Sequence, residues 1–438
     1  MTLYHSKAAG LFFAFVVALS FGGCSNSEDP ASNPVAGEDQ PETKPQATVV
    51  ISPGPDARKQ AQEAMILAQP GDVIEFAAGT FEFDGTLSLD GINDITVRGN
   101  GIDETILNFE SMDAGQGGEG LKVTANDFCI EDLTIENTPG DAIKLQDCDG
   151  VTIQRVRAWW SGGPSTDNGA YGLYPVLCAN VLIDECLASG ASDAGIYVGQ
   201  SKQVIVRNCH ADLNVAGIEI ENCIGADVYD NNASQNTAGI LVFSLPGLTV
   251  KNGSGCRVFN NEINNNNHPN FAKDGAIVST VPSGTGVMLM ANDNVEVFGN
   301  SFGENHGAGC LIVSFLVSRR EYNDEEYDPY CEAISIHDND FYSGGTKAEG
   351  EFLVAFTEAT GQRLPDIVFD GIVDAAKLVD GALPADMGFS IKDNGEASFV
   401  NLDLGRMMLG EEPQISMDLG QHSGSLAPIS AVSIPGVE

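Results

Sequence analysis

The phrase Ala194-Gly195-Ile196-Tyr197-Val198 returns as Ala216-Gly217-Ile218-Glu219-Ile220 and again as Ala238-Gly239-Ile240-Leu241-Val242. Its glycines lie 22 residues apart each time (217−195 and 239−217), and Gly172 precedes Gly195 by 23 residues (195−172). A short strand pattern that repeats at a fixed period of this length indicates a solenoid, in which each repeat forms one coil. Coils of 22–23 residues without helical periodicity predict an all-β fold, a right-handed parallel β-helix with three short strands per turn.

Alternation in the strand after each glycine sorts its side chains into inward and outward columns. The first residue after the glycine is apolar, as in Ile196 and Ile218, and is expected to face the core. The next, outward position reads Lys144, Tyr174, Tyr197, Glu219, Leu241 and Met288 in successive coils. The second outward column reads Gln146, Val176, Gly199, Glu221, Phe243 and Met290. Because a solvated face would carry Thr, Ser, Lys and Glu throughout, this mixture predicts a covered or ligand-facing groove.

Two further columns are expected to be structural. Asn214 and Asn236 each stand three residues before their glycine, with Ser192 and His306 in the same slot of other coils, and predict a ladder of turns. The cysteines also align in columns, as Cys148, Cys178 and Cys223 do, and as Cys186 and Cys209 do. Stacked coils lie about 4.8 Å apart, whereas a disulfide needs Cβ atoms about 3.8 Å apart. We therefore expect buried reduced ladders rather than cross-links.

Both ends of the solenoid, residues 48–350, are expected to be capped. Asp56 is a candidate cap for a helix at about 56–69, and Pro70-Gly71 would stop it. An amphipathic helix here would cover the core of the first coil. Residues 351–438 are predicted to form the last coils and an irregular C-terminal cap. Short strands are expected at 352–356, 367–369, 388–391 and 397–402, with partial disorder after 412.

The first 23 residues are typical of a bacterial lipoprotein signal peptide. The apolar run from Leu11 to Leu19 is too short to span a bilayer, and Ser20-Phe21-Gly22-Gly23-Cys24 matches a lipobox. The alternative is an ordinary signal peptide cut nearby. Residues 24–47 are polar and predict a flexible tether. We expect an exported lipoprotein, anchored through Cys24 at the outer membrane or cell surface, with Ser25 favouring the outer membrane by resemblance to sorted lipoproteins.

The formal charge is −41, from 62 acidic and 21 basic residues. Such a surface repels nucleic acid, so a DNA- or RNA-binding role is excluded. It is compatible with a protein that handles cations.

Three insertions interrupt the period beside the outward face. They are the stretch 159–168, the 47-residue coil between Gly239 and Gly286 (286−239), and the acidic loop 317–330. Long loops in a compact solenoid are more often functional than not. We therefore expect the functional site where these insertions meet the outward columns.

Carboxylates on this face are the first candidates for catalysis. Glu219 and Glu221 are two residues apart on one strand, with Cα atoms about 6.6 Å apart. Such a pair, joined by Asp193 from the neighbouring coil, suits general acid and base work on a sugar, or Ca²⁺ binding. The alternatives are two exposed glutamates on a polar strand and an ordinary turn aspartate.

A second arrangement uses Lys144 with Tyr174 or Tyr197 for β-elimination of a uronic acid. That reaction needs a cation to neutralise the carboxylate, and Arg155 and Arg157 lie on a different strand. Further candidates for contact with a substrate are Phe243, Trp159 and Trp160. The tryptophan pair has an equal alternative, which is to anchor its own loop against the coil. No nucleotide-binding glycine loop, nucleophile elbow, haem-attachment or zinc motif is present in the sequence.

Several phrases resemble those of exported bacterial proteins with a tandem parallel β-helix domain of pectate-lyase-like fold. They are Asn168 to Pro175 (NGAYGLYP), Asp193 to Ser201 (DAGIYVGQS), Asn214 to Asn222 (NVAGIEIEN), Asn236 to Phe243 (NTAGILVF) and the stretch from Asn265 to Met290. The resemblance implies an exported or lipidated β-helix that accompanies a c-type cytochrome-like partner, and it implies no catalytic residue.

Besides a Ca²⁺-stabilised structural module, two functions remain open at this point. The first is a surface protein that binds polysaccharide, or another extended polymer, along its outward face and acts on it as a lyase, hydrolase or uronate epimerase. The second is a non-enzymatic scaffold for an exported c-type cytochrome-like protein.

Overall fold

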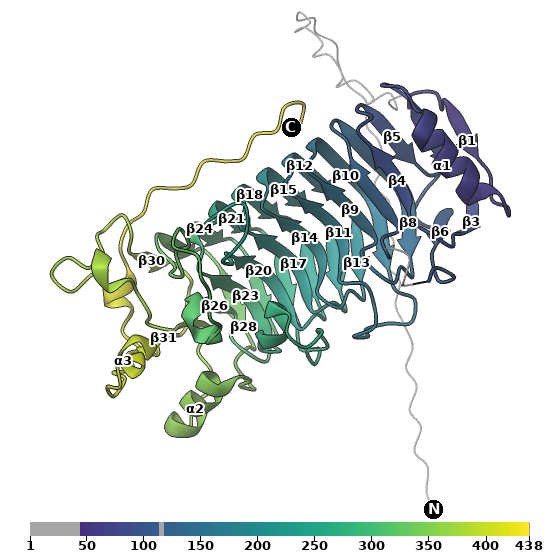
Figure 1. Cartoon of the computed structure of the whole chain (residues 1–438). Coiled ribbons are helices and arrows are strands. Elements are labelled where there is room, and N and C mark those ends of the chain that lie inside the picture. Colours follow the sequence, from purple (N-terminus) through teal and green to yellow (C-terminus); the bar gives the residue numbers. More distant parts are fainter. Residues whose placement is uncertain (1–43, 114–117, 438) are drawn as a thin grey trace, which may run out of the picture. The chain divides into compact units, whose positions relative to one another are not determined.

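The computed structural model describes residues 44–113 and 118–437 (Figure 1). The expected signal peptide, the lipidation site Cys24 and residues 24–43 of the tether lie outside the described residues. The chain divides into residues 1–44 and residues 45–438, and the description below concerns the second unit by itself. In the described residues no helix is both long and apolar enough to cross a membrane.

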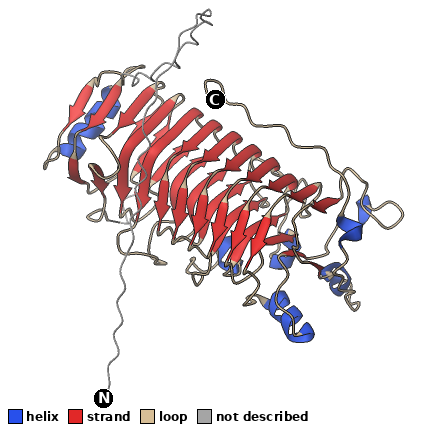
Figure 2. Ribbon diagram, turned by 180° about the vertical axis from the view of Figure 1, so that it is seen from behind, coloured by secondary structure: helices blue, strands red, loops and turns tan. Residues whose placement is uncertain are grey.

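Residues 49–401 form a parallel solenoid of two sheets, which confirms the predicted fold class (Figure 2). Sheet B has eleven strands and contains the repeated phrase. In spatial order these are β31 (Phe399–Asn401), β29 (Ile367–Phe369), β26 (Cys310–Val313), β23 (Thr285–Met290), β20 (Ala238–Phe243), β17 (Ala216–Glu221), β14 (Ala194–Gly199), β11 (Tyr171–Val176), β9 (Ile143–Gln146), β7 (Leu121–Thr124) and β4 (Leu87–Asp90).

Sheet A has twenty strands and supplies the other faces of each coil. Its strands are β1 (Val49–Ile51), β2 (Val73–Phe76), β3 (Gly79–Glu82), β5 (Ile95–Arg98), β6 (Thr105–Asn108), β8 (Phe128–Glu136), β10 (Asp149–Trp159), β12 (Ala179–Asp184), β13 (Leu187–Ser189), β15 (Lys202–Arg207), β16 (His210–Asp212), β18 (Ile224–Tyr229), β19 (Asn232–Ser234), β21 (Ser254–Phe259), β22 (Glu262–Asn264), β24 (Asp293–Phe298), β25 (Ser301–Gly303), β27 (Ile334–His337), β28 (Asp340–Tyr342) and β30 (Phe389–Lys392). The pairing keeps like residues in line, since Ile196 lies opposite Ile218 and Ile218 opposite Ile240. These isoleucines are fully buried, as the inward column requires.

Helix α1 (Ala57–Leu67) packs over the first coils and buries Ala57, Ala61 and Met65. Asp56 is its N-cap residue, but the Asp56 side chain makes no capping hydrogen bond, contrary to expectation. The helix therefore depends on the burial of its apolar face more than on its cap.

Two asparagine ladders run through the turns. In one, Asn214, Asn236, Asn266 and Asn305 are joined coil to coil by side-chain hydrogen bonds of 2.9–3.2 Å. In the coil before Asn214 the ladder position is occupied by Ala191, and in the coil after Asn266 by Asn305. The sequence analysis placed Ser192 and His306 at these two positions, one residue too late in each case. The second ladder contains Asn231, Asn261, Asn300, Asn339 and Asn394.

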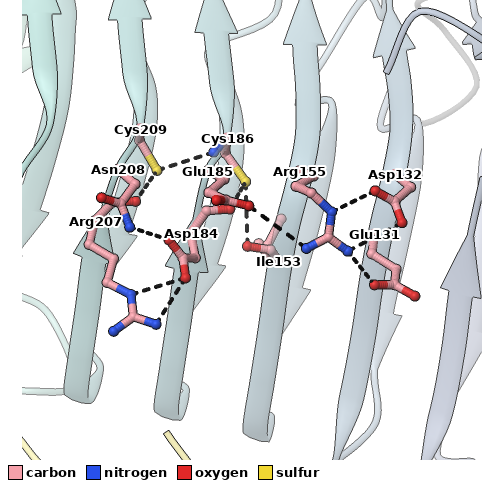
Figure 3. Close-up of polar contacts among 10 residues, drawn as sticks. All are labelled: Glu131, Asp132, Ile153, Arg155, Asp184, Glu185, Cys186, Arg207, Asn208 and Cys209. Carbon is pink, nitrogen blue, oxygen red and sulfur yellow. Dashed lines mark hydrogen bonds and ion pairs between the residues drawn. The ribbon is translucent and has the colours of Figure 1, made fainter. Parts of the chain in front are cut away.

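The nine cysteines of the described residues are all free thiols, and all but Cys129 are buried. Six of these sulfurs lie within hydrogen-bonding distance of backbone carbonyl oxygens; the thiol of Cys186, for example, lies 3.4 Å from the Ile153 oxygen (Figure 3). This arrangement agrees with the expected reduced ladders.

The C-terminal cap differs from the prediction at residues 352–356, described here, and at residues 425–437, described next. Residues 352–356 were expected to form a strand but belong to helix α2 (Glu351–Thr360), which buries Leu353 and Phe356 and ends at Gly361 in a left-handed conformation. A short helix α3 (Leu404–Met408) follows β31.

Residues 425–437 were expected to be partly disordered but run back along sheet A as an extended segment (Figure 1). The backbone N–H of Ile429 donates to Glu296 Oε2 at 3.1 Å, and that of Val432 to Asp227 Oδ2 at 3.0 Å. Ile434 is buried against Leu182 and Ile205.

Candidate functional site

The outward columns of sheet B are covered rather than open to solvent. From β14 to β31 their side chains form a second apolar cluster, separate from the core inside the coils. Phe243, expected to contact a substrate, is fully buried there, as is Leu241. Phe243 therefore packs in the second apolar cluster in this structure, and its contact with a substrate stays a prediction that would require the cover to move.

The three insertions meet over this face, as the sequence led us to expect. Thr166 Oγ1 in the first insertion donates to the carbonyl oxygen of Phe271 in the second at 2.9 Å. Tyr327 in the third insertion donates its hydroxyl to the carbonyl oxygen of Ser244 at 2.7 Å. Phe271 and Tyr327 also pack in the second apolar cluster. The cover thus contains residues from all three insertions.

Under this cover lies a carboxyl cluster formed by Asp193, Glu219 and Glu221. Pairing of β14 with β17 places Tyr197 opposite Glu219 and Gly199 opposite Glu221. The Tyr197 ring folds over Gly199, where any side chain would collide with it. Its hydroxyl thereby reaches the next coil and donates to Glu221 Oε1 at 2.7 Å.

The pKa values of the three carboxyl groups in the cluster are all raised. Burial, together with the charge of Glu221, raises the pKa of Asp193 to about 7. Burial raises the pKa of Glu221 to about 7 against the opposing hydrogen bond from Tyr197. Burial and the charge of Asp193 raise the pKa of Glu219 well above its usual range.

Two oxygens of the carboxyl cluster have no hydrogen-bonding partner in the described protein. They are Asp193 Oδ1 and Glu219 Oε2, both buried. Orphaned buried polar atoms are costly, about 1–3 kcal/mol each. Their persistence favours a role in binding over a role in stability.

Three tyrosines and a lysine border the carboxyl cluster. The rings of Tyr171, Tyr174 and Tyr197 lie 4.5–5.0 Å apart, centroid to centroid. Burial raises the pKa of Tyr174 to about 12, so its phenol is protonated at neutral pH. Lys144 Nζ lies 4.8 Å above the Tyr174 ring. Burial raises the pKa of the neighbouring Asp141 to about 6, although Lys144 opposes this shift.

Tyr171 and Asp141 are the site residues that the sequence reading missed. Tyr171 pairs with Ala194 and occupies the position that alanine fills in the next three coils. An aromatic residue in an otherwise small column was a signal that could have identified Tyr171.

The two tryptophans do not join the carboxyl cluster. Trp160 is buried in the main core and donates its indole N–H to the Thr138 carbonyl oxygen at 2.7 Å. It therefore anchors its loop, which was the alternative function considered for the pair. Trp159 ends β10 on sheet A and lies under the Arg157 guanidinium at 5.3 Å.

Arg155 and Arg157 do not supply a cation to this site. Arg155 lies on the outer face of sheet A, with its Nε donating to Asp132 Oδ1 at 2.6 Å and its Nη2 to Glu131 Oε2 at 2.6 Å (Figure 3). Arg157 pairs with Asp103.

A Ca²⁺ ion at the carboxyl cluster would have to displace the protons that burial favours there. A tighter carboxylate group, Asp293 with Asp328 and Glu332, lies elsewhere. Lys377 Nζ fills it at 2.6 Å from Asp328 and 2.7 Å from Glu332. The positive charge there is already supplied by the protein.

Comparison with known proteins agrees with this architecture. Residues 119–267 match the family model of the right-handed beta helix region. The fold of residues 49–401 is a right-handed parallel β-helix, and no curated protein sequence matches the chain.

The A-module of mannuronan C-5 epimerase AlgE4 from Azotobacter vinelandii is similar over 78% of this chain and 91% of its own, with 14% identity and a TM-score of 0.51. The AlgE6 A-module of the same organism is similar over 78% and 89%, with 15% identity and a TM-score of 0.45. The catalytic unit of a GH87 α-1,3-glucanase from Streptomyces thermodiastaticus is similar over 81% and 55%, with 16% identity and a TM-score of 0.42. At such identities the likeness concerns the fold alone.

Proposed function

We propose that this protein binds a polysaccharide along the outer face of sheet B and processes it by acid–base chemistry at the carboxyl cluster. The observation that carries the proposal is the carboxyl cluster itself: Glu219 and Glu221 are buried, Asp193 is half-buried, and the Tyr197 hydroxyl donates a hydrogen bond to Glu221. Buried polar groups of this kind cost stability, so a functional reason for their presence is expected.

The protonation states supply both an acid and a base. Burial raises the pKa of Glu219 well above its usual range and so favours its protonated form, whereas Asp193 and Glu221, with pKa values of about 7, exchange protons near neutral pH. General acid–base catalysis is most effective when the pKa lies near the working pH. A carboxylate base with a carboxyl acid suits hydrolysis, and a carboxylate base with the Tyr197 hydroxyl suits β-elimination or epimerisation of a uronic acid.

Access to the carboxyl cluster requires the cover to move, because Glu219 is only 1% exposed. Much of the second insertion over it, residues 265–284, has no strand and only a short 3-10 helix at Ile277–Thr280. On the open side, Lys144 and Tyr174 are half-buried and would contact a polymer first.

Replacing Glu221 with Gln or Tyr197 with Phe should lower the rate of polysaccharide conversion by a factor of about 100 or more, because general acid–base groups contribute about 10²–10⁴-fold. Conversion would be measured on acidic and neutral polysaccharides, as unsaturated uronate absorbance, new reducing ends and proton exchange at C5. Glu262→Gln, an exposed glutamate on sheet A, is the matched control.

The outcome that contradicts the proposal is clear. If the wild-type chain neither converts nor retains any polysaccharide, also after removal of residues 267–282, the proposal fails. Equal conversion by wild type and Glu221→Gln would leave polysaccharide processing in place but move it away from the carboxyl cluster.

The membrane anchor is a further part of the proposal, supported by the lipobox before Cys24. Cys24→Ser should shift the protein from the membrane fraction to the soluble fraction and abolish incorporation of labelled palmitate. Cys129→Ser is the control, since this half-buried thiol belongs to sheet A. Retention of Cys24→Ser at the membrane would argue for a different attachment.

The cytochrome scaffold remains a second hypothesis from the family resemblance. No feature of residues 44–113 or 118–437 favours it over the polysaccharide proposal.

A further inference from the structure

A cavity of about 300 Å³ lies on the outer face of sheet B, over its last coils. It is lined by Met288, Met290 and Leu311 of β23 and β26 and by Val368 of β29, all of which are buried. Phe352 of α2 also lines it. Protein interiors rarely leave voids much larger than a water molecule, whereas ligand pockets occupy about 300–1,000 Å³.

One charged residue, Asp370, lines the buried part of this cavity. Asp370 directly follows β29, in which Val368 packs in the second apolar cluster outside the coils and Phe369 packs in the core inside them. Because side chains alternate along a strand, the Asp370 side chain stands on the outer face with Val368. Asp370 is only 2% exposed. The cavity therefore combines apolar walls with a buried carboxyl group.

The Asp370 carboxyl group has acceptor sites to spare. Its Oδ2 accepts the backbone N–H of Ser314 at 2.7 Å, and its Oδ1 accepts that of Ile372 at 2.8 Å. An ionised carboxylate offers about four acceptor sites, so about two remain for a ligand. Within the part of the chain that the structure describes, no cation pairs with Asp370. A buried charge without an opposite charge is costly, and a bound cation would offset that cost.

The other polar side chains of the lining are bonded within the protein. Arg319 and Glu351 are both exposed, and Arg319 Nη1 lies 3.1 Å from Glu351 Oε2. Glu349 pairs with a neighbouring lysine. The hydroxyl groups of Thr280 and Ser318 are hydrogen-bonded to nearby backbone groups. Among the described residues that line the cavity, the buried carboxyl group is thus the only charged group without an opposite charge beside it.

The charge around this cavity favours a cationic ligand. Three carboxylates and one guanidinium line it, and the whole chain has a formal charge of −41. Such a field attracts cations and repels anions. The walls in turn favour an aromatic body, because methionine sulfur makes favourable contacts with aromatic rings.

We propose that this cavity binds a small organic cation, a primary ammonium group carried on a compact aromatic body. The ammonium group would donate to the free acceptor sites of Asp370, and the ring would lie against Met288, Met290 and Phe352. A hydrogen bond between two charged groups is about twice as strong as one between neutral groups. The ammonium ion should therefore bind more tightly than an alcohol of the same shape.

The test titrates the full-length protein with 2-phenylethylammonium, 2-phenylethanol and 3-phenylpropionate by calorimetry at pH 8. Burial raises the pKa of Asp370 to about 7, so at pH 8 the carboxyl group is largely ionised while the ammonium group keeps its proton. We expect saturable binding of the ammonium ion, with a Kd about tenfold or more below that of the alcohol. The carboxylate should not bind.

Two variants locate the site. Asp370→Asn removes the charge but keeps the shape, so it should weaken binding of the ammonium ion about tenfold or more and leave that of the alcohol within about twofold. Thr280→Lys adds a cation at an exposed residue of the lining and should weaken binding of the ammonium ion about threefold or more. Thr80→Lys, the same change at an exposed threonine of β3, is the matched control and should leave it unchanged.

Circular dichroism and thermal unfolding check that each variant folds. If Asp370→Asn does not fold, the preference of the wild type for the ammonium ion and the comparison of the two lysine variants decide.

Four results would overturn the proposal. They are no saturable binding of 2-phenylethylammonium, equal or tighter binding of 2-phenylethanol, unchanged affinity for the ammonium ion in folded Asp370→Asn, and equal affinity in Thr280→Lys and Thr80→Lys. The last would mean that the net charge of the chain, rather than this cavity, controls binding. Every measurement is made without polysaccharide, so the result is independent of polysaccharide conversion.

Discussion

The protein should resist urea better at pH 5 than at pH 8, which is opposite to the usual loss of stability on acidification. Burial raises the pKa values of Glu221 and Asp370 to about 7. Asp370 is only 2% exposed, and its carboxylate accepts backbone N–H groups from Ser314 and Ile372 without a cation beside it. Charging such groups is costly in the folded state.

The sign follows from proton binding. Between the unfolded value near 4 and the folded value near 7, these carboxyl groups bind more protons when folded than when unfolded. The free energy of unfolding therefore falls as the pH rises through this window, by up to about 1.4 kcal/mol per pH unit for each such group. The stabilising contribution is complete below about pH 4 and is lost above pH 7.

Urea midpoints at pH 5, 6.5 and 8 would measure this dependence. Asp370→Asn should flatten the profile, because the amide does not ionise, whereas Asp340→Asn on β28 should leave its slope unchanged. A stability that rises from pH 5 to pH 8 would show that these carboxyl groups are more hydrated or better paired than the structure indicates.

Asn236→Ala should destabilise the protein by at least about 3 kcal/mol, because several buried partners lose their hydrogen bonds at once. Asn236 Oδ1 accepts from the backbone and side-chain nitrogens of Asn214 at 3.0 and 3.1 Å. Its Nδ2 donates to the Ala211 carbonyl oxygen at 2.9 Å and to Asn266 at 3.0 Å. The side chain is fully buried, so water cannot replace these bonds.

Chemical denaturation of Asn236→Ala would give this loss of free energy. Asn232→Ala is the control, because that half-buried side chain makes one bond to Glu262 on sheet A, and we expect a loss below about 1 kcal/mol. Equal losses of unfolding free energy in the two variants would mean that the ladder asparagine contributes no more to stability than an asparagine outside the ladder.

The fold could be predicted from the sequence because its determinants are local and repeated. Each glycine of the repeated phrase is followed by an inward isoleucine, and the register of β14, β17 and β20 follows directly. The helix at residues 351–360 escaped this reading, because a short apolar run such as Phe352 to Phe356 fits a strand and a buried helix equally well.

The site could be predicted only in part. Glu219, Glu221 and Asp193 were placed together by counting along the coils, and the carboxyl cluster contains all three. Their burial depends on where the second insertion, which contains Phe271, folds back over sheet B. This insertion has no repeating pattern, so its position over the sheet could not be predicted from the sequence. The same limit explains why Phe243 seemed available to a ligand.

The extended segment 425–437 changes how the whole solenoid must behave. Coils of a solenoid normally contact only their neighbours, so each can form or melt almost independently of distant ones. Here Ser433 lies 230 residues from its partner Gln203, and Val432 lies 205 residues from Asp227. Residues 425–437 therefore hold coils that lie far apart along the chain, and we expect them to couple the melting of one coil to that of another several turns away.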